Sequence, residues 1–247
     1  MSEAAMVAPL ATPTPGAPEK KAVRSMFDRI APRYDLLNRL LSAGTDARWR
    51  RRAVDFLGLG SQGCVLDLCT GTADLLIEWL GRGPGCSGAG IDLSTEMLSR
   101  GTWKLAARGH APRAGLLAGD AERLPFADSR FDAAMVAFGI RNVGDVDAAL
   151  REAFRVLRPR GRIVILEFAM PGGMAGQLYR LYFDRLLPMV GGLLSGDSRA
   201  YRYLPASVRR FDTPAALGER LARAGFQAIE ARRLSLGIAW LHRGERP

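Results

Sequence analysis

Residues 63–74 read Gly-Cys-Val-Leu-Asp-Leu-Cys-Thr-Gly-Thr-Ala-Asp, and this stretch decides the fold class of the chain. The apolar run 65–68 predicts a buried strand, and Gly71 predicts a tight turn directly after it. Apolar residues at helical spacing follow over 74–80. A strand that enters a helix through a glycine turn points backbone N–H groups at a ligand, so the stretch predicts a small-molecule site.

Two acidic landmarks narrow the ligand to a nucleoside. Asp92 ends the apolar run 89–91, and an acid at the tip of a second strand commonly binds ribose hydroxyls. The Gly-x-Gly-x-x-Gly pattern of dinucleotide sites is incomplete, because Thr72 and Ala73 follow Gly71. Asp120 and Ala121 come after a third predicted strand, where S-adenosylmethionine enzymes carry an acid for the adenine amino group. We therefore expect S-adenosyl-L-methionine as the cofactor.

Composition predicts one domain. The chain has 247 residues, of which 48% are hydrophobic, enough for a full core. Residues 1–22, rich in Ala, Pro and Thr, predict a disordered tail before a domain over 23–247. The longest apolar run, 186–194, is shorter than the ~20 residues of a spanning helix, so a cytoplasmic protein is expected. Two histidines and three cysteines without C-x-x-C spacing predict no metal site.

The charge balance favours an anionic partner. The net charge is +10 with a pI near 10.3. The run Arg48-Trp49-Arg50-Arg51-Arg52 looks like a phosphate grip, yet the chain shows no nucleic-acid module and its arginines are spread throughout. We expect no nucleic acid and a transient contact with the anionic inner face of the cytoplasmic membrane. A homodimer is compatible with the sequence.

Strands and helices are predicted to alternate from residue 63 onward. The expected strands are 64–69, 87–92, 114–119, 131–138, 161–168, 227–233 and 236–242, and the expected helices are 73–82, 95–108, 145–157 and 214–224. Such alternation predicts a doubly wound α/β fold with a mostly parallel seven-stranded sheet. The short connection between the last two strands predicts an antiparallel last strand. Residues 23–57 predict helices in front of the first strand, with a break at Pro32.

Residues 169–213 exceed what a crossover needs, since 214–224 already supplies a helix. They place apolar residues at helical spacing over 178–187. Long insertions at the carboxyl end of such strands often carry substrate recognition, so we expect a helical lid over the cofactor and an apolar substrate. The alternative is an ordinary buried helix pair.

Several ordered motifs resemble one known family. They are Phe27-Asp28-Arg29-Ile30-Ala31-Pro32-Arg33-Tyr34-Asp35-Leu36-Leu37-Asn38, Asp120-Ala121-Glu122-Arg123-Leu124-Pro125-Phe126, Phe138-Gly139-Ile140-Arg141-Asn142-Val143, Arg155-Val156-Leu157-Arg158-Pro159 with Leu166-Glu167-Phe168, and Tyr201-Arg202-Tyr203-Leu204-Pro205. Over about 23–245 the chain resembles the UbiE/MenG group of quinone-biosynthesis C-methyltransferases. The resemblance implies a class I S-adenosylmethionine-dependent methyltransferase fold.

The resemblance also implies a reaction and its cofactor site. The reaction is methyl transfer to a ring carbon of a polyprenylated quinol, demethylmenaquinol or, alternatively, the methoxy-benzoquinol of ubiquinone synthesis. Ala73 and Ala137 depart from the pattern of some members and lean toward demethylmenaquinol. More distant alternatives are a small-molecule or phospholipid N-methyltransferase and a non-catalytic accessory protein. The implied cofactor contacts are Thr72, Asp92, Asp120 and Ala121, to which the glycine turn adds Gly71 and Asp67.

Three residues are candidates for the chemistry. Arg141 follows the fourth strand, where it would stabilise a phenolate, and Asn142 and Tyr34 would position the ring oxygens. The plainer alternatives are a salt bridge for Arg141, a turn cap for Asn142 and core packing for Tyr34. A structural role is expected for His242.

Overall fold

The structure, a computed structural model, describes residues 19–172, 176 and 198–247. Three helices precede the sheet: α1 (Lys20–Ile30), α2 (Tyr34–Leu41) and α3 (Thr45–Leu57). Pro32 lies in a 3-10 turn between α1 and α2, because proline has no N–H for the helical ladder. The helix α1 begins inside the segment expected to be a disordered tail.

The described residues form a seven-stranded sheet with the order β3-β2-β1-β4-β5-β7-β6. Only β7 runs antiparallel to its neighbours β5 and β6, which confirms the expected doubly wound sheet with an antiparallel last strand. The strands are β1 (Gln62–Leu68), β2 (Gly85–Asp92), β3 (Ala114–Ala118), β4 (Phe131–Ala137), β5 (Leu157–Phe168), β6 (Gln227–Leu234) and β7 (Ala239–Glu245).

Four strands begin elsewhere than predicted: β1 and β2 begin two residues early, and β5 and β7 differ by more. Strand β5 begins at Leu157 because the chain turns straight from α6 into an extended segment, with a register shift against β4. Strand β7 begins at Ala239, not 236, because Ser235–Gly237 forms a 3-10 turn. Leu236 has a left-handed φ of 59° in that turn, which no strand accommodates.

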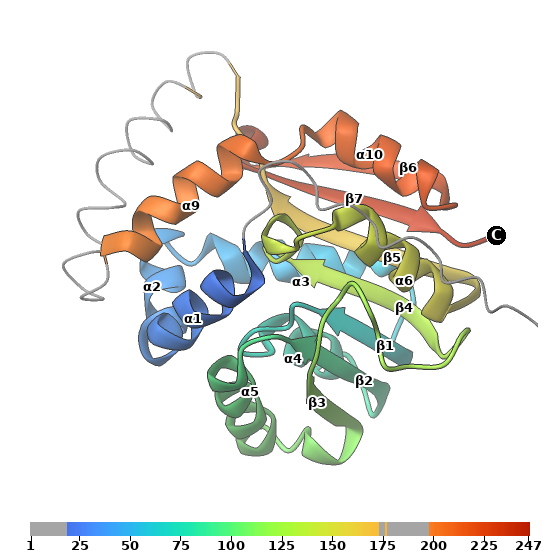
Figure 1. Ribbon diagram of the computed structural model, residues 1–247. Helices are drawn as coiled ribbons and strands as arrows, with labels where there is room; N and C mark the ends of the chain where they lie inside the picture. Colours follow the sequence, from blue (N-terminus) through green and yellow to red (C-terminus); the bar gives the residue numbers. More distant parts are fainter. Residues whose placement is uncertain (1–18, 173–175, 177–197) are drawn as a thin grey trace, which may run out of the picture.

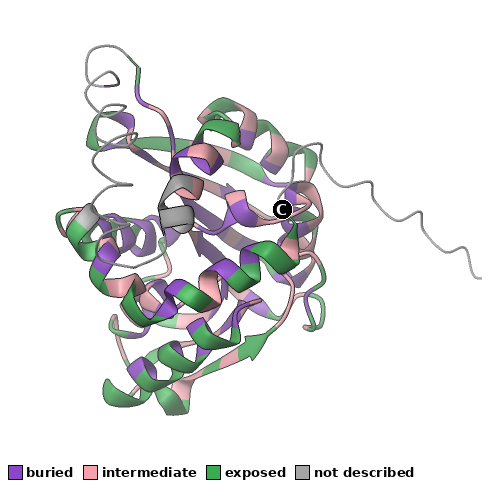
Figure 2. Ribbon diagram, turned by 60° about the vertical axis from the view of Figure 1, so that its left-hand side comes forward, coloured by how far each residue is buried: buried purple, intermediate pink, exposed green. Residues whose placement is uncertain are grey.

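Helices cover both faces of the sheet (Figure 1). The helices after the first strand are α4 (Asp74–Leu80), α5 (Thr95–Ala107), α6 (Val146–Val156), α9 (Ser198–Arg210) and α10 (Pro214–Arg223). Successive strand residues point to opposite faces, so Val65 packs with α3 and α4 while Leu66 packs with α6 and α10. Figure 2 shows the resulting buried centre, with helices exposed on their outer sides.

A third apolar cluster lies beyond one end of the strands, where α1, α2 and α9 gather in Figure 1. Met26 and Ile30 of α1, Leu37 of α2, Met97 of α5 and Val208 of α9 make it. These helices therefore close over the carboxyl ends of the parallel strands, which is the usual ligand-binding end of such a sheet. The expected lid is described only in part: α9 belongs to it, whereas its apolar segment 178–194 lies outside the described residues.

Candidate functional site

A cavity that opens to solvent lies between the strand ends and the N-terminal helices, and its space together with its solvent-filled mouth is about 710 Å³. Its floor comes from the segments that directly follow β1, β2, β3 and β4, and its roof comes from α1 and α2. It brings together six of the predicted cofactor and acceptor residues from distant parts of the sequence: Tyr34 on the roof, and Gly71, Asp92, Asp120, Ala121 and Asn142 below it.

Asp92 organises the cavity at the end of β2. One carboxylate oxygen accepts the Gly71 N–H at 2.8 Å, and the other accepts the Ser94 N–H at 2.9 Å. Burial raises the pKa of Asp92, although these backbone donors oppose the shift. The acid therefore links the glycine turn to the second strand. A carboxylate at this place accepts hydrogen bonds from two neighbouring hydroxyls of a ribose.

Asp120 lies farther along the same cavity and contacts the roof. Lys20 Nζ lies 2.6 Å from a carboxylate oxygen of Asp120 and 2.6 Å from one of Glu122. The hydroxyl of Ser94 also donates to Asp28 of α1 at 2.6 Å. The helix α1 is thus tied by polar contacts to the ends of β2 and β3. Lys20 therefore belongs to the site, although it falls within residues 1–22, for which the sequence predicts a disordered tail.

Thr72 and Asp67 face a second, smaller chamber beside the large one. The Thr72 hydroxyl donates to Asp35 at 2.6 Å and accepts from Lys104 at 3.0 Å. Thr72 does not cap α4, because Ala73 occupies the N-cap position with a left-handed φ of 64°. Asp67 accepts the hydroxyl of Thr70 at 2.6 Å, so it orders the glycine turn. Desolvation raises the pKa of Asp67 to about 7.

Arg141 is paired with Glu167, a buried acid for which the sequence predicts no catalytic or binding role. Its guanidinium lies 2.7 Å from Glu167 of β5, and the two side chains are 6% and 2% exposed. The same group donates to the Phe138 carbonyl and to the Ser207 hydroxyl of α9. Arg141 lies behind the cavity wall and is not among the lining residues. Burial raises the pKa of Glu167, while Arg141 opposes the shift.

Asn142 and Tyr34 do line the large cavity. The Asn142 side-chain oxygen accepts the Tyr203 hydroxyl of α9 at 3.0 Å. Its amide nitrogen lies 3.5 Å from the Phe138 carbonyl, at the limit of a hydrogen bond. Burial raises the pKa of Tyr34, so its hydroxyl stays protonated and can donate to an anion in the cavity.

His242 has the structural position expected for it. It is 1% exposed on β7, and one ring nitrogen lies 2.8 Å from the Pro214 carbonyl. Burial lowers the pKa of this histidine. It does not line the cavity. Over the described ranges, no helix is long and apolar enough to span a membrane, and no three potential ligands are grouped around a metal position.

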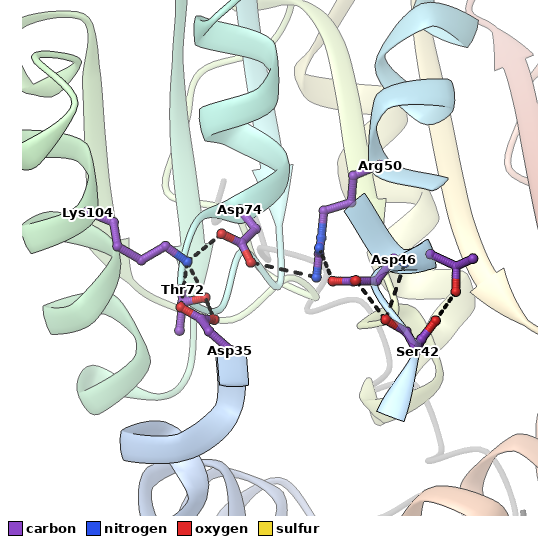
Figure 3. Close-up of polar contacts among 8 residues, drawn as sticks. Asp35, Ser42, Asp46, Arg50, Thr72, Asp74 and Lys104 are labelled. Atoms are coloured by element: carbon purple, nitrogen blue, oxygen red, sulfur yellow. Dashed lines mark hydrogen bonds and ion pairs between the residues drawn. The ribbon is translucent and has the colours of Figure 1, made fainter. Parts of the chain in front are cut away.

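Two polar residues near the site that the sequence did not predict, Glu167 and Lys104, each have a partner far away along the chain. Glu167 is 26 residues from Arg141, and Lys104 is 69 residues from Asp35, which it contacts in Figure 3. The available signals were a charged residue in the apolar run of β5 and a lysine on the apolar side of α5. Neither signal identifies its partner without the fold.

Comparison with known proteins identifies the family. Residues 16–246 match the profile of the ubiE/COQ5 methyltransferase family. The demethylmenaquinone methyltransferase of Thermus thermophilus is 50% identical over 223 residues, 90% of this chain and 100% of that protein. The ubiquinone/menaquinone biosynthesis C-methyltransferase UbiE of Geotalea daltonii is 45% identical over 91% of this chain and 96% of that one.

Solved structures agree on the fold at low identity. The [4+2]-cyclase SpnF superposes with a TM-score of 0.71 at 18% identity, over 94% of this chain and 97% of that one. A SAM-dependent methyltransferase from Aquifex aeolicus gives a TM-score of 0.59 at 17% identity, over 80% and 89% of the two chains. The sheet order, the acids along the cavity and the match over nearly the whole chain lead to one assignment: this chain belongs to the ubiE/COQ5 methyltransferase family.

Proposed function

We propose that this chain transfers the methyl group of S-adenosylmethionine to a ring carbon of demethylmenaquinol, which gives menaquinol. The observation that carries the proposal is the large cavity itself. Asp92 and Asp120 provide acids for an adenosine, while Phe27, Phe138 and Val143 provide an apolar wall for an acceptor ring. Membership in a methyltransferase family supports the donor, and the relative from Thermus thermophilus supports the acceptor.

The residues fit the donor in kind and position. The sulfonium supplies a strongly electrophilic methyl group, so the chain has to align donor and acceptor and to manage one proton. We assign the ribose hydroxyls to Asp92 and the adenine amino group to Asp120, next to Ala121. Lys20 has to yield its contact with Asp120 for this, because both bind the same carboxylate. Gly71 lets the backbone approach closely, with a φ of 54° that favours glycine.

The acceptor ring needs an ionised hydroxyl next to the carbon that is methylated. In the transfer the S–CH₃ bond breaks and leaves its electron pair on sulfur, and a bond from the methyl group to the ring carbon forms. The ring proton then passes to water, which restores the aromatic ring. We assign Tyr34 as a donor to the ring oxygen and Asn142 as a second polar group that positions the ring. A direct contact from Arg141 requires its guanidinium to exchange Glu167 for the phenolate.

Quinone analysis of a deletion strain tests the proposal. Mass spectrometry is expected to find demethylmenaquinone accumulated and menaquinone absent, with recovery by the intact gene and none by Asp92→Asn. A strain that accumulates a methoxy-benzoquinone precursor instead would favour the ubiquinone acceptor, which the name of the Geotalea daltonii relative includes. Unchanged quinones would contradict both acceptors.

We also propose that this protein acts in the cytoplasm and meets its lipid acceptor at the membrane surface. Three large apolar side chains on α2 and α5 support such contact: Leu36 and Leu40 are 60% and 53% exposed, and Trp103 is 71% exposed. Leu36 and Trp103 line one hollow together with Arg100. Apolar side chains enter the headgroup boundary, and exposed basic residues such as Arg39 and Arg100 favour an anionic leaflet.

Co-sedimentation with phosphatidylglycerol vesicles at low salt tests this surface. Trp103→Ser is expected to lower the bound fraction at least threefold. Leu236→Ser is the matched control, since Leu236 is also 71% exposed but lies at the β6–β7 edge of the sheet. Equal losses in both variants, or none in Trp103→Ser, would contradict the proposed surface. A homodimer remains a prediction, and sedimentation of the full chain measures it.

A further inference from the structure

The helix α9 contacts the turn that follows β4 through two polar side chains. The Tyr203 hydroxyl donates to the side-chain oxygen of Asn142 at 3.0 Å. One helical turn later, the Ser207 hydroxyl accepts from the Arg141 guanidinium at 3.3 Å. Residues four apart lie on the same face of a helix, so one face of α9 holds two consecutive residues of this turn.

Only one of these four residues lines the large cavity, and that residue is Asn142. It is 8% exposed, so the few groups around its amide decide how the amide is oriented. A side-chain amide has an oxygen that only accepts hydrogen bonds and a nitrogen that only donates them. What Asn142 can do to a ligand therefore depends on which of these two atoms faces the cavity.

Two neighbours fix this orientation. Burial raises the pKa of Tyr203, so its hydroxyl is protonated and can donate to the Asn142 oxygen. The Phe138 carbonyl, which can only accept, lies 3.5 Å from the Asn142 nitrogen. A rotated amide would place two acceptor oxygens against each other at Phe138. One carbonyl takes at most one of the two N–H groups on the amide nitrogen, so the other N–H group stays available to a ligand.

We propose that Tyr203 is a positioning residue, whose hydroxyl fixes the Asn142 amide so that an N–H group faces the ring oxygen of the acceptor quinol. The inference rests on the proposed function and adds the reason why Asn142 can act there as a donor. An ionised ring hydroxyl is an anion, which an N–H group stabilises and an amide oxygen repels. Tyr203 acts through Asn142, since Tyr203 itself does not line the cavity.

The plainer alternative is that the Tyr203 hydroxyl only holds α9 against the turn after β4. In that case its loss loosens α9 whichever residue stands at position 142. A positioning role predicts instead that the loss of the hydroxyl lowers turnover only while Asn142 is present. The two roles therefore differ in how the two side chains are coupled, which a double-mutant cycle measures.

The cycle is carried out on the full chain with S-adenosylmethionine and a demethylmenaquinol that has a short prenyl chain. Tyr203→Phe is expected to lower kcat/KM for the quinol about tenfold, while calorimetry finds the affinity for S-adenosylhomocysteine unchanged within about twofold. In the Asn142→Ala background the same substitution is expected to change kcat/KM by less than about twofold. Equal losses in both backgrounds, or no loss in the first, would overturn the positioning role.

Thr102→Val is the control for the removal of a hydroxyl. The Thr102 hydroxyl also makes a hydrogen bond, to the Leu98 carbonyl at 2.9 Å, but Thr102 lies on α5 outside the lining of both chambers. Its kcat/KM is expected to match that of the unaltered chain. A loss equal to that of Tyr203→Phe would overturn the assignment, because any lost hydroxyl would then have the same effect.

Asn142→Asp tests the proposal without a change at Tyr203 and without a residual rate in Asn142→Ala. The aspartate keeps an oxygen for the Tyr203 hydroxyl but replaces the N–H donor by a second acceptor. Thermal unfolding is expected to show a folded chain, and kcat/KM is expected to fall at least about tenfold. Normal turnover would overturn the proposal. Absence of turnover of the quinol by the unaltered chain would instead contradict the proposed function.

Discussion

At the scale of single residues, the site is a set of buried charges with shared partners. Asp92 accepts two backbone N–H groups, Glu167 accepts Arg141, and Arg50 lies between two acids. Such groups are expensive to bury unless their hydrogen bonds are made. Each of these side chains therefore contributes to the stability of the fold besides any role in ligand binding. A test by substitution has to measure stability and binding separately.

Asp92→Asn is expected to weaken binding of S-adenosylhomocysteine about tenfold to hundredfold. The amide keeps an acceptor for one of the two backbone N–H groups, from Gly71 or Ser94, so part of the local structure is retained. Hydrogen bonds from ribose to a charged acceptor, about 1.5–3 kcal/mol each, are lost. Calorimetry measures the affinity and thermal unfolding measures the fold. Asp132→Asn is the control, because Asp132 also accepts a backbone N–H, from Cys64 at 2.7 Å, outside the cavity lining. Unchanged affinity in Asp92→Asn would remove Asp92 from the site.

Arg141→Met is expected to lower the free energy of unfolding by about 3–5 kcal/mol, because it leaves the Glu167 carboxylate buried without its cation. The double variant Arg141→Met/Glu167→Gln is expected to recover most of this stability. If Arg141 also holds the phenolate, kcat stays low in the stable double variant while donor affinity is normal. If the double variant recovers turnover together with stability, Arg141 has only a structural role in the wall of the cavity.

At the scale of elements, the site depends on how closely two strand ends approach. The turn after β1 brings Cys69 against Gly139, which follows β4, and both Cys69 and Phe138 have left-handed φ values of 52° and 58°. A Cβ at Gly139 would lie 2.4 Å from the Cβ of Cys69. The glycine is therefore required by packing between elements, not by its own backbone angle.

Gly139→Ala is expected to destabilise the fold by about 1–3 kcal/mol and to reduce turnover, because the segment that carries Asn142 has to move away from the glycine turn. Cys69→Gly in the same chain is expected to restore both, since it removes the opposing Cβ at a left-handed position. Thermal unfolding and a turnover assay measure the effect. Gly115→Ala is the control, because a Cβ there meets nothing within 4 Å. A single variant as stable as the unaltered chain would refute the close approach.

At the scale of the whole molecule, buried acids affect stability through pH. A carboxyl whose folded pKa is raised contributes stability that is complete below its unfolded pKa and is lost as the pH rises through its folded pKa. Burial raises the pKa of Asp67 from 3.8 to about 7, so the window for this residue runs from about pH 4 to pH 7.

Asp67→Asn is therefore expected to gain stability relative to the unaltered chain as pH rises, by about 2–3 kcal/mol between pH 5 and pH 8. Urea unfolding at a series of pH values measures the difference. Asp128→Asn, at a side chain that is 74% exposed, is the control and is expected to show little slope. A difference that stays constant with pH would contradict the raised pKa of Asp67.

The sequence by itself determined the fold class and the end of the sheet at which the large cavity lies. Strand, glycine turn and helix are local patterns, and parallel strands bring their carboxyl ends together, so Gly71, Asp92, Asp120 and Ala121 could be assigned to one site. The antiparallel last strand followed from a connection too short for a crossover. These features depend on residues that are neighbours in the chain or on the order of strands and helices. The spacing of apolar residues in the sequence predicts both.

Only the tertiary structure decided which charges meet. Arg141 faces Glu167 instead of the cavity, Arg50 alone of its run faces the small chamber, and Lys20 reaches Asp120 across 100 residues. A charged side chain has many partners of similar energy along the chain, and the fold selects one by excluding water around it. For that reason several residues of the large cavity could be assigned to one end of the sheet from the sequence, whereas the partners of the arginines and lysines around it could not.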